Sequence, residues 1–148
     1  MMISDILRPE SVRCGVKTGS KKAALEILAG LIADTDPGLT QTEVFSCLLA
    51  REKLGSTGLG NGIALPHGRL KHSDKTLGAF VRLDSAIDYD AVDGNPVDLL
   101  FALVVPEEST QEHLDILAKL AEMFSNDNAL NKIRKKKSNM DIYDILVS

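Results

Sequence analysis

A glycine-rich run near the middle of the chain limits how this sequence folds more than any other segment. Residues 55–68 read GSTGLGNGIALPHG, with a histidine, His67, between a proline and a glycine. Pro66 fixes its own φ and favours an extended conformation at Leu65, so the backbone that leads to the histidine is partly preset. Because glycine has no Cβ, four positions permit a positive φ and a close approach of the backbone to a ligand, namely Gly58, Gly60, Gly62 and Gly68. The run therefore predicts a loop that presents His67 as a reactive imidazole.

The size and charge of the chain narrow the class of protein. A length of 148 residues fits one domain that spans 1–148, and a domain of this size buries roughly 70% of its unfolded surface without disulfides or metal. The net charge of −4 provides no general attraction for nucleic acid or for an anionic membrane surface. We therefore expect a partner that is recognised locally.

The cysteines and the N-terminal segment predict a cytoplasmic protein. Cys14 and Cys47 lie far apart and have no metal-ligand spacing, which favours two reduced thiols over a disulfide or a zinc site. Residues 1–8 lack the basic start and the long apolar core of a signal peptide. No segment approaches the ~20 apolar residues of a membrane span, so we expect no direct membrane insertion.

The order of the expected elements indicates a mixed β-sheet flanked by helices, an α/β class with α+β character. Strands are predicted at 11–16, 77–83 and 99–105, with an irregular connection at 87–92. Helices are predicted at 21–33, 41–53, 110–124 and 127–137, with a short one after residue 138. Their N-terminal caps are expected at Ser20, Thr40, Ser109 and Ser138. Because helices and strands do not alternate as βαβ units, a doubly wound parallel sheet is disfavoured.

His67 has the chemistry of a phosphoryl acceptor. A neutral imidazole, with an unperturbed pKa of about 6.5, carries a free lone pair near neutral pH. Phosphoryl transfer demands mainly positioning and charge stabilisation, which the N–H groups of the run and the hydroxyls of Ser56 and Thr57 are able to supply. The alternative is a turn histidine beside a loop that is glycine-rich for folding reasons. The local pattern alone leaves both interpretations open.

A second histidine is predicted in the first turn of the helix at 110–124. On that helix, His113 shares a face with apolar residues at 116, 117, 120 and 124, so its ring is expected on the core side. The field of the helix N-terminus disfavours the imidazolium and favours a nearby anion. A neutral His113 is then able to donate a hydrogen bond to a phosphoryl oxygen. A histidine bonded to a carbonyl of the core is the simpler alternative.

Two arginines lie close enough in the sequence to serve the same site. Arg51 stands near the end of the second predicted helix, and its guanidinium would offset phosphate charge by forked hydrogen bonding. The ordinary alternative is a surface ion pair with Glu52 or another acidic residue. Arg69 is the rival cation, and His72, in a polar stretch, is interpreted as a solvated surface residue.

Several ligand classes are disfavoured by spacing. Residues 58–62 follow GxGxG and not GxGxxG, and the chain has no Gly-Lys-Ser/Thr, so we expect neither dinucleotide binding nor a nucleotide P-loop. The two histidines at 67 and 72 have no familiar zinc spacing. The basic run 134–137 lacks interleaved aromatic residues, which favours a solvated helix end over a nucleic-acid site. We therefore predict no bound dinucleotide, no metal and no nucleic-acid partner.

Residues 51–68, REKLGSTGLGNGIALPHG, resemble enzyme IIA domains of the phosphoenolpyruvate-dependent phosphotransferase system, in the fructose and mannitol class. The likeness is closest to the nitrogen-regulatory branch, whose members carry KLGSTG before GNGIA. It covers nearly the whole chain, because PEE at 106–108 and EHL at 112–114 sit where the family has its second histidine. The resemblance implies a mixed β-sheet flanked by helices, in agreement with the order of the expected elements.

The resemblance also implies a role for three residues. It implies that His67 is phosphorylated, that His113 supports the phosphoryl group and that Arg51 lies beside the site. The phosphate-loop candidates of the glycine-rich run are Ser56, Thr57, Gly58, Gly60, Asn61, Gly62 and Gly68. No cofactor belongs to the phosphohistidine step in this family.

The partners are implied by the same resemblance. The phosphoryl donor would be a small histidine phosphocarrier protein, itself charged by a phosphoenolpyruvate-dependent kinase. The nitrogen-regulatory branch binds regulators or transport components, such as those of potassium homeostasis, according to its phosphorylation state. One alternative is a sugar-specific enzyme IIA that passes its phosphate to a separate IIB/IIC transporter. Another is a non-enzymatic module that binds a small anion and forms no covalent adduct.

Overall fold

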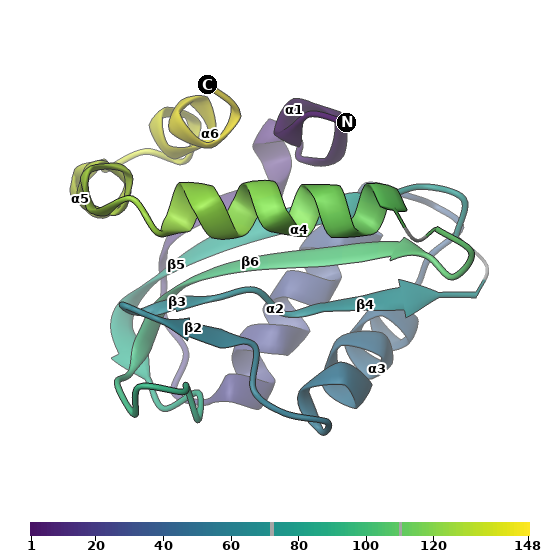
Figure 1. Ribbon diagram of the computed structural model, residues 1–148, viewed down its shortest axis with the longest axis horizontal. Coiled ribbons are helices and arrows are strands. Elements are labelled where there is room, and N and C mark those ends of the chain that lie inside the picture. The colour runs from purple at the N-terminus through teal and green to yellow at the C-terminus, as the bar shows by residue number, and fades with distance from the viewer. Residues whose placement is uncertain (72, 110) are drawn as a thin grey trace.

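A mixed β-sheet lies between two layers of helices (Figure 1). The computed structural model describes residues 1–71, 73–109 and 111–148. The strands are β1 Val12–Val16, β2 Gly58–Gly60, β3 Ile63–Ala64, β4 His67–Leu70, β5 Leu77–Ile87 and β6 Val97–Pro106. The helices are α1 Ile3–Ile6, α2 Lys21–Ala33, α3 Gln41–Glu52, α4 Gln111–Phe124, α5 Asp127–Lys135 and α6 Asn139–Val147, with a 3₁₀ turn at Pro9–Ser11. The predicted mixed sheet flanked by helices is confirmed.

Strand β6 is the centre of the sheet. The strand order is β1-β5-β6-β3-β2, and β4 also pairs with β6. Strand β5 runs antiparallel to β6, whereas β3 and β4 run parallel to it, one after the other along its opposite edge. Helices α2 and α3 cover one face of the sheet, and α1, α4, α5 and α6 cover the other. All residues from Leu99 to Val105 are therefore buried, as is typical of a strand covered on both faces.

The helix caps follow the sequence prediction at three sites. The hydroxyls of Ser20 and Ser138 each accept a hydrogen bond from the backbone N–H three residues on. Thr40 and Glu43 form a reciprocal capping box. These bonds satisfy N–H groups that the first turn of a helix otherwise leaves without partners.

Two of the sequence predictions fall on residues that the structure does not describe. They are the helix start at Thr110 and the surface position of His72. The described part of α4 begins at Gln111. Helix α5 ends at residue 135 instead of 137, and β5 continues to residue 87, four residues beyond its predicted end.

The glycine-rich run is not a loop, and this corrects the sequence prediction. It contains β2, β3 and the start of β4, because its short apolar segments complete the edge of β6. Positive φ values occur in the turn between β2 and β3, at Gly60 (98°), Asn61 (57°) and Gly62 (80°). Gly58 and Gly68 have no positive φ. Glycine is required at these two positions because neither has room for a side chain. A Cβ at Gly58 would lie 2.7 Å from Cβ of Ala91, and one at Gly68 would overlap Sγ of Cys47.

We expect Gly68→Ala to destabilise the fold by about 1–3 kcal/mol, because the added methyl group must displace a packed side chain. Chemical denaturation measures the free energy of unfolding. Gly19→Ala is the matched control, since a Cβ there meets no atom within 4 Å. In a Cys47→Ala background the cost of Gly68→Ala should shrink. Equal costs in the two backgrounds would contradict the steric explanation.

Candidate functional site

His67 is held by a hydrogen bond from its own ring. It is the first residue of β4, and its Nδ1 lies 2.7 Å from the carbonyl oxygen of Leu65. A carbonyl oxygen only accepts, so Nδ1 carries the proton and donates it. The lone pair of the neutral ring is therefore on Nε2. This acceptor was not foreseen from the sequence, although the extended conformation that Pro66 favours at Leu65 is the feature that aims it.

His113 lies beside His67. Their ring centroids are 5.6 Å apart and the rings are inclined at 44°. His113 is 6% exposed and shares the buried face of α4 with Ile116, Leu120 and Phe124, as predicted. Its Nδ1 is buried and lacks a hydrogen-bond partner. The alternative of a histidine whose Nδ1 is bonded to a carbonyl of the core is therefore not what the described residues show.

Arg51 completes the group of three predicted side chains. It lies in the last turn of α3 and its Nη1 donates to the carbonyl oxygen of Gly55 at 3.0 Å. It does not pair with Glu52, whose carboxylate is buried and bonded to Lys21. The rival cation Arg69 also reaches the site, where its Nη1 donates to the carbonyl oxygen of Glu107 at 3.3 Å.

Two hollows meet at His67. The histidine hollow, about 430 Å³, is lined by Cys47, Arg51, Leu54, His67, Arg69 and His113, among others. The apolar hollow, about 390 Å³, also borders His67 and includes Leu59, Leu65, Val92 and Leu117. Arg51 and His67 line both. The imidazole thus borders both a hollow that contains two cationic side chains, Arg51 and Arg69, and an apolar depression.

The hydroxyls of Ser56 and Thr57, predicted from the sequence as phosphate-loop candidates, are used inside the fold. Ser56 Oγ donates to the carbonyl oxygen of Tyr89 at 2.9 Å and accepts from Gly58 N at 3.1 Å. Thr57 Oγ1 donates to the Glu52 carboxylate, and Thr57 N donates to the same group at 3.1 Å. These N–H and hydroxyl donors are therefore already occupied.

The turn at 60–62 lies away from both hollows. Asn61 N donates to Asp93 at 3.2 Å, and its carbonyl oxygen accepts from Arg134 at 2.8 Å. Gly62 is packed against Arg134 and Asp98. Gly60, Asn61 and Gly62 therefore shape the β2–β3 turn, whereas Gly68 lines the histidine hollow and Gly58 the apolar hollow.

Burial keeps both histidines neutral. It lowers the pKa of His67, and the charge of Arg51 acts in the same direction, while the hydrogen bond to Leu65 and the charge of Glu52 oppose it. The pKa of His113 is also lowered, first by burial and then by His67 and Arg69. An imidazole with a pKa below its ordinary value of about 6.5 is unprotonated at pH 7 and has a free lone pair.

Cys47 borders the same hollow as a thiol. Both cysteines are free, as predicted. Burial raises the pKa of Cys47 to about 11, and its Sγ donates to the carbonyl oxygen of Arg69 at 3.2 Å. A thiol in this state is a poor nucleophile at neutral pH.

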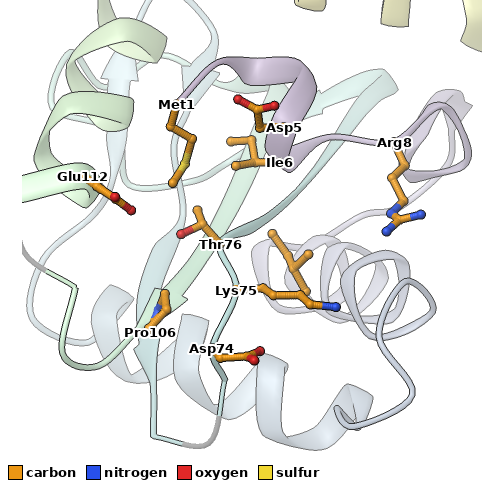
Figure 2. Close-up of a pocket in the computed structure, with 10 residues that line it drawn as sticks. Met1, Asp5, Ile6, Arg8, Asp74, Lys75, Thr76, Pro106 and Glu112 are labelled. Carbon is orange, nitrogen blue, oxygen red and sulfur yellow. The ribbon is translucent and has the colours of Figure 1, made fainter.

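A further hollow of about 350 Å³ lies between α1, the connection from β4 to β5, and α4 (Figure 2). The carboxylates of Asp5, Asp74 and Glu112 are spread around it and do not converge. Within the described ranges, no cluster of three or more His, Cys, Asp or Glu side chains is placed to bind a metal ion. No helix in those ranges has the length and apolar character needed to cross a membrane.

The family is established by comparison with known proteins. The family model "Phosphoenolpyruvate-dependent sugar phosphotransferase system, EIIA 2" matches residues 5–148. The chain belongs to this family. The nitrogen regulatory protein of Pseudomonas aeruginosa is 43% identical to this EIIA 2 chain over 145 residues, which cover 98% of the chain and 94% of that protein. Membership makes the chain a component of the phosphotransferase system, and the likeness supports a regulatory role.

Solved structures agree with this assignment. The crystal structure of the nitrogen regulatory protein IIA-Ntr from Neisseria meningitidis superimposes on this EIIA 2 chain with a TM-score of 0.91 at 41% identity, covering 97% of this chain and 98% of that one. The mannitol IIA of Escherichia coli has a TM-score of 0.77 at 21% identity, over 94% and 97% of the two chains, and shows the same fold. The resemblance inferred from residues 51–68 is confirmed.

We expect both histidines of the hollow to titrate below about 6.5, the ordinary histidine pKa. Replacing His67 by Gln should raise the midpoint of His113, because a charge on His67 disfavours a second charge nearby. Proton NMR of the imidazole signals measures both midpoints. The lowered pKa values mean that the folded state binds fewer protons than the unfolded state. The stability that depends on neutral His67 and His113 is therefore fully present above about pH 6.5 and is lost as the pH falls through their folded pKa values. An unchanged His113 midpoint in His67→Gln would contradict the coupling.

Proposed function

We propose that this EIIA 2 chain is a cytoplasmic phosphocarrier that accepts a phosphoryl group on Nε2 of His67 and acts as a phosphorylation-dependent regulator. The observation that carries the proposal is the bond from Nδ1 of His67 to the Leu65 carbonyl, which leaves the lone pair on the opposite nitrogen. Arg51 and His113 border the same hollow. The donor proposed from the family resemblance is a histidine phosphocarrier protein.

The transfer step follows from this geometry. The Nε2 lone pair attacks the phosphorus in line, the N–P bond of the donor phosphohistidine breaks, and its electron pair stays on the donor nitrogen. The His67 ring gains positive character as the new N–P bond forms, while Nδ1 keeps its proton. The Leu65 carbonyl stabilises that charge through the existing hydrogen bond. The guanidinium of Arg51 and the ring of His113 stabilise the negative charge on the transferring oxygens.

The surface around His67 suits a protein partner. Three large apolar side chains that border the two hollows are strongly exposed, namely Leu54 (83%), Leu59 (47%) and Val92 (80%). Leu114, in the first turn of α4, is also exposed. Exposed apolar groups around a polar centre are typical of a protein interaction site. A carrier protein docked there would exclude water from the two histidines.

A regulatory role is favoured over sugar transport by the degree of likeness. Sequence identity is 43% to a nitrogen regulatory protein and 21% to mannitol IIA. Phosphorylation would add about −1.5 to −2 charges beside the exposed apolar side chains, which is enough to switch binding of another protein. By the family resemblance, the targets are regulators or transport components of nitrogen and potassium metabolism. The second candidate is a sugar-specific IIA that donates to a separate IIB/IIC transporter.

We predict an acid-labile phosphoryl adduct when the protein is incubated with phosphoenolpyruvate, the first kinase of the system and a histidine phosphocarrier protein. His67→Ala should abolish it. Arg51→Ala and His113→Ala should slow its formation by about 10² to 10³, the usual cost of removing a charge-stabilising donor. Rapid-quench measurement with labelled phosphoenolpyruvate gives the rates. Arg8→Ala, an exposed arginine outside both hollows, is the control and should react normally.

An adduct that persists in His67→Ala would refute the site assignment. Normal rates in both Arg51→Ala and His113→Ala would show that these two side chains are structural. Addition of a sugar-specific IIB domain then separates the two candidate functions. Retention of the phosphoryl group supports regulation, whereas rapid loss supports sugar transport.

A further inference from the structure

A continuous path of hydrogen bonds connects a buried carboxylate to the ring of His67. Thr57 N donates to Oε1 of Glu52 at 3.1 Å. Leu65 N donates to the carbonyl oxygen of Thr57 at 3.1 Å. Nδ1 of His67 then donates to the carbonyl oxygen of Leu65 at 2.7 Å. Each bond fixes the segment that supplies the next acceptor.

The carboxylate at the start of this path is fully engaged. The Glu52 side chain is 2% exposed and lies 2.9 Å from Nζ of Lys21. Its second oxygen accepts from Thr57 Oγ1, which also lies 3.3 Å from the hydroxyl of Tyr89. Withdrawing a carboxylate from water is costly unless it is paired and hydrogen-bonded, and Glu52 meets both conditions. A polar network satisfied in this way is rigid.

We propose that Glu52 is a positioning residue for phosphoryl transfer, because it fixes Thr57 and thereby the Leu65 carbonyl that keeps the proton of His67 on Nδ1. This inference rests on the proposed function of His67. Glu52 borders neither the histidine hollow nor the apolar hollow, so it acts only through other groups.

The position of the Leu65 carbonyl matters because it determines which nitrogen of His67 carries the proton. If the Leu65 carbonyl moves away, the neutral ring is free to carry its proton on Nε2. That nitrogen then has no lone pair for phosphorus. The charge of Glu52 also raises the pKa of His67, although burial lowers it more.

The test separates the acceptor function of Glu52 from its charge. Glu52→Gln keeps an oxygen that can accept from Thr57 N but has no charge. Glu52→Asp keeps the charge but withdraws the oxygens by one methylene group. Tyr89→Phe is the matched control, since it removes a buried hydroxyl from the same network without interrupting the path. The ¹⁵N chemical shifts of the imidazoles report the tautomer, and the His67 signals are assigned by their loss in His67→Ala.

We expect Glu52→Asp and Glu52→Ala to populate the Nε2–H tautomer and to slow phosphoryl transfer by about 10²-fold, the cost of misplacing a reacting group by roughly 1 Å. Glu52→Gln and Tyr89→Phe should keep the Nδ1–H tautomer and most of the rate. The proposal is overturned if Glu52→Asp keeps the wild-type tautomer and rate, or if Glu52→Gln loses as much as Glu52→Asp. The tautomer is measured on unphosphorylated protein. If the wild-type protein accepts no phosphoryl group, the proposed function is overturned, whereas the effect of Glu52 on the tautomer is still tested.

Discussion

The pairing of β6 with two successive strands along one edge is the constraint on which the site depends. Strand β3 pairs with Leu99 and Leu100, and β4 pairs with β6 from Leu103 onward. Only Leu65 and Pro66 join these strands. Pro66 has no N–H to donate, and its carbonyl oxygen accepts from Leu103 N at 2.9 Å. The Leu65 carbonyl accepts from the His67 ring, so the strand junction itself sets the tautomer of the proposed nucleophile.

Three segments that are distant in the sequence meet at this junction. The end of α3 supplies Arg51, the start of β4 supplies His67, and the first turn of α4 supplies His113. Strand β6 organises all three, since it pairs with β4 on one side, leads into α4 at its end and, together with β4, contacts α3 (Figure 1). Burial of the two rings then lowers both pKa values, which leaves two neutral imidazoles beside each other.

The sequence predicted much of this arrangement from local rules. Helix caps, apolar periodicity and the buried run at 99–105 indicated the mixed sheet, and the helical position of His113 placed its ring on the core side. The glycine-rich run was interpreted wrongly, because its conformation is decided by pairing with β6 and not by its own composition. Position 68 requires a glycine because a Cβ there would overlap Sγ of Cys47. The two residues are 21 positions apart, so no local pattern reveals this contact.

The same limit applies to the candidate phosphate groups. Ser56 and Thr57 carry hydroxyls suited to an anion, yet Tyr89 and Glu52 occupy them inside the fold. Arg51, His67, Arg69 and His113 bring suitable chemistry to one hollow, and no spacing rule joins them in the sequence.

The identity of the phosphorylated nitrogen tests the account most directly. Phosphorus–nitrogen couplings, measured by NMR on ¹⁵N-histidine-labelled protein after phosphorylation, distinguish the two ring nitrogens of His67. The bond from Nδ1 to the Leu65 carbonyl predicts a phosphoryl group on Nε2, with the proton of Nδ1 retained. A phosphoryl group on Nδ1 would contradict the account, because that nitrogen could not then donate to Leu65.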